Sequence, residues 1–125
     1  MKYMILTYLD EKAWSNLSEE EQKREMELCA PQVQKLMSSG KLLGGAPLHE
    51  TSTATTLRMR DGKRLMTDGP FAETREQLGG YSIIEAENLD EALAIASGFL
   101  SPESKMATSL EVRPIVEFPE VPAVK

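Results

Sequence analysis

The chain has 125 residues, of which 41% are hydrophobic and 27% are charged, and its formal net charge is −6 at pH 7. This length suits one domain with a single core, and the acidic balance argues against a nucleic-acid partner, which would need a basic surface. The only cysteine, Cys29, excludes an intrachain disulfide. No apolar run approaches the roughly 18 residues of a membrane span, and the apolar start, residues 1–9, is too short for a secretion signal. We therefore expect a cytoplasmic protein.

The first predicted element is a strand over residues 2–9 that is apolar on both faces. Because neighbouring side chains of a strand point to opposite faces, one set can meet helices while the other needs cover as well. The two sets are Tyr3, Ile5 and Leu9, and Met4, Leu6 and Tyr8. The second apolar set is the first indication of a further layer or of a partner subunit.

A long helix is predicted next. Ser18 and Glu21 have the spacing of a capping box, which opens a helix that runs to about Ser39. Pro31 lies in the middle of this stretch and removes a backbone hydrogen bond, so we expect a kink there. The apolar stripe of the helix includes Cys29, which we expect to pack as a small hydrophobic residue. After residues 41–46, the chain reads as a loop.

Residues 54–60 and 63–67 are predicted to form a hairpin around an Asp-Gly pair. A two-residue turn would place Arg58 opposite Leu65 and mix polar and apolar side chains on one face. A three-residue loop would place Leu57 opposite Leu65 instead. We favour the second register because it keeps the apolar residues together.

The last third of the chain contains a strand, a helix and a final strand. The strand covers residues 79–87, and the helix begins at Asn88, which has the capping-box spacing to Glu91. The helix is expected to end at Ser101-Pro102, because proline cannot continue it easily. The final strand covers residues 110–118, where apolar and charged residues alternate.

These elements follow one another in the order β-α-β-β-β-α-β. This order predicts an α+β domain of ferredoxin-like plan with an antiparallel sheet, in which two helices cover one face. The other sheet face stays partly apolar, and we expect it to pair with a second copy, giving a homodimer of the dimeric α/β-barrel type. Residues 1–118 would form one domain, and residues 119–125 an extended C-terminal arm.

The densest pattern in the chain is the run Thr67–Thr74, TDGPFAET, which is followed by QLGGY at residues 77–81. Pro70 fixes its own backbone and disfavours helical geometry at Gly69. Asp68 is therefore expected at a forced bend at the end of a strand.

Together with other segments, this run resembles the signature of the DGPF-domain, YCII-related family. The further matching segments are Lys2–Leu9, Thr53–Thr56, Leu89–Leu93 and Leu110–Pro114. The resemblance implies a small ferredoxin-like α+β domain that dimerises, with a cavity near the aspartate of the DGPF motif. The biochemical activity of the family is generally unassigned, so the resemblance indicates the architecture and leaves the chemistry open.

Asp68 is the leading candidate for chemistry, and two interpretations of it are open. Its carboxylate can act as a general acid or base, or anchor a cationic or hydroxyl-bearing ligand. Alternatively, it can accept backbone N–H hydrogen bonds near Pro70 and Phe71 and so hold the turn.

His49 is the only histidine and the only side chain whose ordinary pKa lies near neutrality. It could form an acid/base pair with Asp68, or it could be a solvated loop residue. Such a pair is similar to one proposed as catalytic in the wider YCII group, where the histidine occupies a different part of the motif pattern.

Other residues could line a ligand pocket. Phe71, Tyr81 and Tyr8 could wall it, although tyrosines in strands are usually core or interface residues. Arg75 would favour the ionised form of Asp68 if the two side chains are close, although a solvated position is the simpler expectation. One histidine and no spare cysteine predict no metal site, and no cofactor is predicted.

Three functional hypotheses follow. The first is a small dimeric enzyme-like protein that binds a small organic molecule beside Asp68 and transfers a proton in an isomerase- or lyase-type reaction. The second is a non-catalytic ligand-sensing or transcription-linked module without direct DNA contact, because proteins of the family it resembles often occur beside sigma factors of the extracytoplasmic-function type. The third is a scaffold dimer without a site. Whether the protein is an enzyme is left undecided by the sequence.

Overall fold

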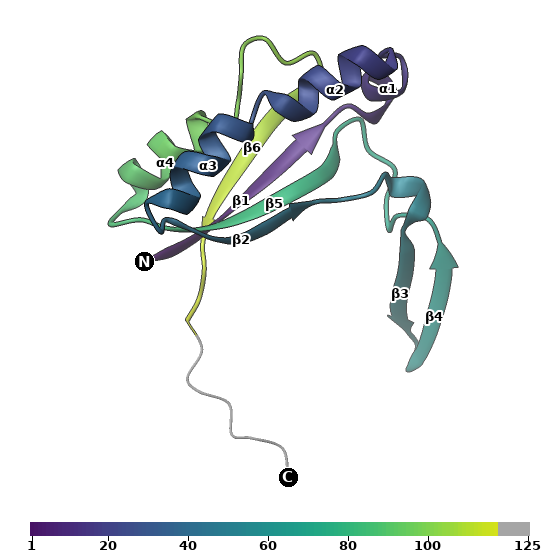
Figure 1. Cartoon of the computed structure of the whole chain (residues 1–125). Helices are drawn as coiled ribbons and strands as arrows, with labels where there is room; N and C mark the ends of the chain where they lie inside the picture. Colours follow the sequence, from purple (N-terminus) through teal and green to yellow (C-terminus); the bar gives the residue numbers. More distant parts are fainter. Residues whose placement is uncertain (118–125) are drawn as a thin grey trace.

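A computed structural model describes residues 1–117 of the chain (Figure 1). Its elements are, in chain order, β1 (Lys2–Leu9), α1 (Glu11–Ser15), α2 (Glu19–Glu27), α3 (Ala30–Ser38), β2 (Leu42–Pro47), the 3-10 turn η1 (Thr51–Thr53), β3 (Thr55–Arg60), β4 (Lys63–Asp68), β5 (Gln77–Glu85), α4 (Leu89–Ser97) and β6 (Ala107–Pro114). The predicted arm at residues 119–125 lies outside the described residues.

Four of the strands form one antiparallel sheet in the order β2-β5-β1-β6, and β3 and β4 pair only with each other. The helices lie on one side of the four-stranded sheet, and the β3–β4 hairpin projects from the end of the sheet that is far from α4 (Figure 1). The molecule is therefore α+β with antiparallel sheets, an arrangement compatible with the predicted ferredoxin-like plan.

The core lies between the four-stranded sheet and the helices α3 and α4. Ile5 and Ile84, on the two central strands, are the largest fully buried side chains. Burying an isoleucine completely contributes about 1.5–3 kcal/mol. The buried hydrophobic residues are Tyr3, Ile5, Leu36, Ile84, Ala86, Ala92, Ile95, Ala96 and Phe99. The prediction that Tyr3 and Ile5 face the helices is thus confirmed.

The predicted long helix is instead two helices, α2 and α3. The capping box is confirmed: Glu21 N–H donates to Ser18 Oγ at 3.1 Å, and Ser18 N–H donates to Glu21 Oε1 at 3.2 Å. Pro31 lies in the first turn of α3. An N–H in a first turn has no partner within the helix, so the proline begins a new helix there rather than bending a continuous one.

Two hydrogen bonds fasten α3 to the end of α4. Gln32 Nε2 donates to Ile95 O at 3.1 Å, and the Cys29 thiol donates to Phe99 O at 3.6 Å. Burial, and secondly the charge of Glu25, raise the pKa of the Cys29 thiol. Cys29 packs against the core as a neutral side chain, as expected from its place on the apolar stripe.

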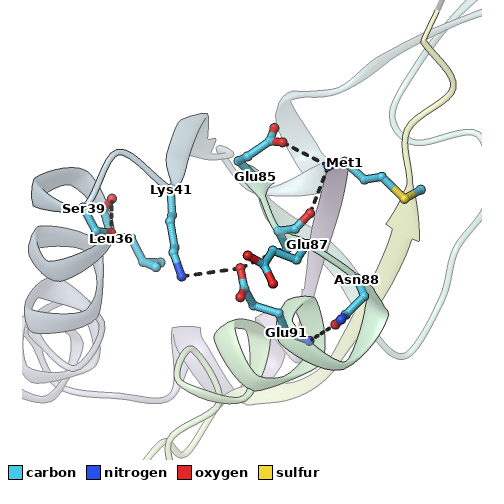
Figure 2. A network of polar contacts seen from close by, with 9 residues as sticks. Met1, Leu36, Ser39, Lys41, Glu85, Glu87, Asn88 and Glu91 are labelled. Carbon is cyan, nitrogen blue, oxygen red and sulfur yellow. Dashed lines mark hydrogen bonds and ion pairs between the residues drawn. The ribbon is translucent and has the colours of Figure 1, made fainter.

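A polar network closes the opposite end of the helical layer (Figure 2). Glu91 N–H donates to Asn88 Oδ1 at 2.9 Å, which caps α4. Glu91 does not complete a capping box, since its carboxylate pairs with Lys41 Nζ at 3.4 Å. Nearby, the Met1 nitrogen donates to Glu85 Oε1 at 3.0 Å. The start of α4 is thereby tied to the residue that precedes β2.

β2 is a strand that the predicted order of elements leaves out. It is an edge strand, and a proline such as Pro47 is tolerated there because one side of the strand needs no partner. Gly45 has φ +145°, and a Cβ atom at this residue would lie 2.5 Å from Tyr81 O. Because glycine has no Cβ, β2 can approach β5 closely. The chain therefore has one strand more than its sequence pattern indicates.

Other element boundaries are shifted. β5 begins at Gln77, before the predicted start at residue 79, and α4 ends at Ser97, before the predicted stop. β6 begins at Ala107 and ends at Pro114, whereas the prediction was residues 110–118. Its early start follows from pairing with β1, because Ala107 lies opposite Leu9.

The hairpin has the register that the apolar pattern disfavours. Arg58 lies opposite Leu65, so the prediction that Leu57 lies opposite Leu65 is wrong. Asp61 has φ 52° and Gly62 has φ 76°, so a two-residue turn of type I′ joins the strands. Among residues 1–117, no core covers either face of the hairpin, so burial does not select the apolar pairing. The geometry of the turn decides the register instead.

We expect Gly45→Ala to destabilise the protein by about 1–3 kcal/mol, because alanine would be strained at this φ and would meet the backbone of β5. Gly44→Ala is the matched control, since its added methyl group has open space and its free energy of unfolding should change by less than about 0.5 kcal/mol. Urea unfolding followed by circular dichroism measures both. Equal effects of the two substitutions would contradict the close approach of β2 to β5.

Candidate functional site

The DGPF turn, residues 68–71, begins at the last residue of β4 and folds back on the hairpin. Gly69 N–H donates to Ala54 O at 2.7 Å, and Thr56 Oγ1 donates to Gly69 O at 2.8 Å. Arg58 Nη2 donates to Phe71 O. Gly69 has φ +99°, which side chains larger than hydrogen rarely adopt. The turn is therefore fixed by contacts with β3 and by its own glycine.

Asp68 is exposed at the end of β4, opposite Thr55. Within residues 1–117 its carboxylate accepts no hydrogen bond and forms no ion pair. The backbone hydrogen bonds that would make Asp68 the clamp of the turn are not formed, and other residues hold the turn. The carboxylate is left free to meet a ligand.

His49 is exposed in the segment between β2 and η1. Leu48 N–H donates to Gly79 O at 2.8 Å, which fixes the start of this segment to β5. In the described part of the chain no hydrogen bond or ion pair joins His49 to Asp68. The acid/base pair therefore stays a prediction.

An open hollow of about 510 Å³ lies where the segment before β5 meets β1 and β6. The structure brings Tyr8 and Arg75 together there, whereas Asp68, His49 and Phe71 do not line it. The lining residues are Tyr8, Thr74, Arg75, Glu76, Ser109, Leu110 and Glu111. A tyrosine hydroxyl, a guanidinium and two carboxylates give this hollow donors and acceptors for a small polar molecule.

The remaining predicted site residues lie apart from one another. Phe71 is 74% exposed beside the DGPF turn. Tyr81 is half-buried on β5, opposite Leu6. It shares with Leu6 the sheet face that the helices leave uncovered, because directly opposite residues of antiparallel strands point to the same side.

Glu76, at the rim of the hollow, has hydroxyl groups beside its carboxylate. The hydroxyls of Thr108 and, secondly, Ser109 lower the pKa of the Glu76 carboxyl. Ser109 Oγ donates to Glu76 Oε1 at 2.9 Å. Thr108 Oγ1 donates to Tyr8 O at 3.3 Å. These contacts favour a negative charge at the rim of the hollow.

Sequence reasoning missed Glu76, Ser109 and Glu111. The available signal was the alternation of the final strand, which places Ser109 and Glu111 on one face. Only the pairing of Tyr8 with Ser109 shows that this face adjoins the tyrosine.

Within residues 1–117, no three histidine, cysteine, aspartate or glutamate side chains gather as metal ligands. In the same part of the chain, no helix is long and apolar enough to cross a membrane.

The fold and the DGPF turn define a class of small α+β domains that carry an aspartate on a projecting hairpin. The chain belongs to the YCII-related domain family, whose model matches residues 1–119. It is similar to an uncharacterized protein of Rhizobium meliloti (strain 1021), with 43% identity over 115 residues that cover 92% of each chain. The resemblance seen in the sequence is thereby confirmed.

We expect Ser109→Ala to raise the pKa of Glu76 toward its ordinary value of 4.5, because the ionised carboxylate loses a donor. At pH values above that ordinary pKa, ionised Glu76 stabilises the folded chain through its hydrogen bonds. This stabilisation is lost as the pH falls through the lowered pKa. The variant should therefore be less stable than the wild type at neutral pH, and the two should converge in acid. Carbon-detected NMR titration and unfolding at several pH values measure this, with Ser38→Ala as the control. An unchanged titration of Glu76 would contradict the contact.

Proposed function

We propose that the protein is a homodimer that binds a small organic molecule beside Asp68, and that Asp68 transfers a proton in an isomerase- or lyase-type reaction. The observation that carries this proposal is that the Asp68 carboxylate has no partner within residues 1–117, while other residues hold its turn. A free carboxylate on a fixed backbone is preorganised for a ligand, because binding needs little further ordering of the chain.

In this proposal Asp68 takes a proton from a carbon atom of the ligand. It returns the proton to a neighbouring atom in an isomerisation or to the leaving group in an elimination, so neither reaction consumes a proton overall. Phe71 offers an apolar surface next to the carboxylate, in keeping with its 74% exposure. His49 is the candidate for a second acid or base. Tyr8, Arg75 and Tyr81 are the candidates for binding the polar groups of the ligand.

The dimer is supported by the uncovered face of the four-stranded sheet. The helices lie on the other side (Figure 1). The side chains that β1 and β5 direct to the uncovered face are only half-buried within one chain: Met4, Leu6, Tyr8, Tyr81 and Ile83. An apolar surface of this kind is typical of a protein interface.

The sensing module linked to sigma factors is the alternative. It is favoured by the lack of a hydrogen bond between Asp68 and His49 among the described residues, since a lone carboxylate suits the anchoring of a ligand better than an acid/base couple. The two proposals share the ligand site and differ only in turnover.

Asp68→Asn should leave the free energy of unfolding within about 0.5 kcal/mol of the wild type, because its carboxylate holds no other group in place. It should abolish the thermal stabilisation that small hydroxylated or cationic ligands give the wild type. Glu73→Gln, in the same exposed run, is the control and should keep that stabilisation. A loss of about 2 kcal/mol in Asp68→Asn, with no ligand that stabilises the wild type, would assign the aspartate to the scaffold.

Proton NMR of the bound ligand in D₂O separates the enzyme from the sensor. Proton transfer replaces a carbon-bound hydrogen of the ligand by deuterium, and the exchange disappears in Asp68→Asn. Binding without exchange or conversion would favour the sensing module.

Leu6→Asp should convert the dimer to a monomer at micromolar concentration. A charge at the centre of an apolar interface should weaken association at least about 30-fold, which corresponds to about 2 kcal/mol. Leu93→Asp is the control, because Leu93 is 48% exposed on α4 and lies on the helical side. Light scattering measures the mass, and a monomeric wild type would refute the dimer.

A further inference from the structure

The two faces of the β3–β4 hairpin differ in what covers them. Thr56 and Arg58 alternate on one face and donate to the backbone of the DGPF turn. Leu65 lies opposite Arg58 and shares this face. The first face of the hairpin therefore contacts the DGPF turn of the same chain.

The second face carries three large apolar side chains, which are exposed, and it also carries Arg64, which lies opposite Met59. Leu57 lies opposite Met66, and Met59 alternates with Leu57 on the same side. Leu57, Met59 and Met66 are 66%, 65% and 72% exposed, whereas Leu65 on the first face is 42% exposed. We call Leu57, Met59 and Met66 the arm face.

A hairpin of this kind needs further support. Two strands without a third strand or a helix against them are marginally stable in water. All of β4 is exposed, as is β3 apart from Thr56. Three large apolar side chains on one side of such a hairpin indicate a surface that becomes covered on association.

The distribution of net charge along the chain indicates which partner covers the arm face. Residues 55–68 contain four basic and two acidic residues, a net charge of +2, and because the whole chain carries −6, the remainder carries −8. The hairpin and the body of the same chain are thus complementary in sign. Opposite net charges favour contact between the hairpin of one copy and the body of another.

The direction of the hairpin fits the same partner. It extends beyond the sheet on the side away from the helices (Figure 1). A second copy seated on the uncovered sheet face would therefore lie next to the hairpin. The arm face and the uncovered sheet face are both apolar, so one partner can cover both.

We infer that the β3–β4 hairpin is a dimer arm, which packs its arm face on the body of a second copy of this chain. The inference rests on the proposed dimer and adds a second contact to it. Asp68 lies opposite Thr55, which alternates with Leu57, so the carboxylate shares the arm face. The ligand site beside Asp68 then lies between the two copies and is incomplete in one chain.

Met66→Glu tests the arm, with Leu65→Glu as the matched control on the other face of the same strand. Met66→Glu should raise the dissociation constant of the dimer at least about tenfold, because it places a charge in an apolar contact. Leu65→Glu should change it less than about threefold. Sedimentation over a concentration series measures the constant, and circular dichroism verifies that each variant is folded.

The result separates this inference from the proposed function. If Met66→Glu leaves the dimer intact or acts no more strongly than Leu65→Glu, while Leu6→Asp dissociates it, the arm is refuted and the sheet interface stands. A monomeric wild type refutes both.

Photo-cross-linking keeps the inference testable where a charge perturbs the hairpin itself. The apolar cross-linker p-benzoylphenylalanine is placed at position 66, and ¹⁵N-labelled and unlabelled chains are mixed. Cross-linked peptides of mixed isotope content, joining position 66 to the body of another chain, are expected. Cross-links within one chain alone would refute the arm.

Discussion

The burial of one face of the four-stranded sheet against α3 and α4 is the constraint on which the rest of the structure depends. Ile5 and Ile84 are completely enclosed there, and the helices are held in place by their own contacts, such as that of Gln32 with the end of α4. Strand side chains alternate, so fixing these residues inward directs Met4 and Leu6 to the other side. The helices cover only one face of the sheet, and the other, partly apolar face is the one that the proposed dimer would cover.

The DGPF motif combines a structural and a chemical element. Its glycine adopts a left-handed backbone, and Thr56 and Arg58 hold the turn through its carbonyl groups. Asp68 takes no part in these contacts within the described chain, so the motif presents a carboxylate that folding does not require. Because Asp68 stands on the projecting hairpin and Arg75 lines the hollow at the body, the candidate site residues form two groups in one chain. In the proposed dimer, the second copy would bring the two groups together.

Much of the fold was predictable because its signals are local. The capping box of Ser18 and Glu21 acts within one helical turn, and the alternation in β1 reports which residues can be buried together. The bend at Gly69 follows from the proline after it. The candidate site was predictable only in part. Asp68 and Arg75 stand in a recognisable run, whereas strand alternation gives only the face on which Ser109 lies and no local pattern pairs it with Glu76. The contact between Glu76 and Ser109 depends on how β1 pairs with β6.

By itself, the sequence determined the family, the starts of α2 and α4, the inward face of the first strand and the position of the DGPF turn, because each depends on residues close together in the chain. Tertiary structure decided what depends on distant partners. The glycine-rich segment at Gly45 becomes a strand only because β5 lies beside it, and Pro31 begins a helix because α3 has its own place on the sheet. The register of the β3–β4 hairpin also depends on tertiary structure. Apolar pairing predicts a register only when a core selects it, and this hairpin stands outside the core, so the backbone of Asp61 and Gly62 sets it instead.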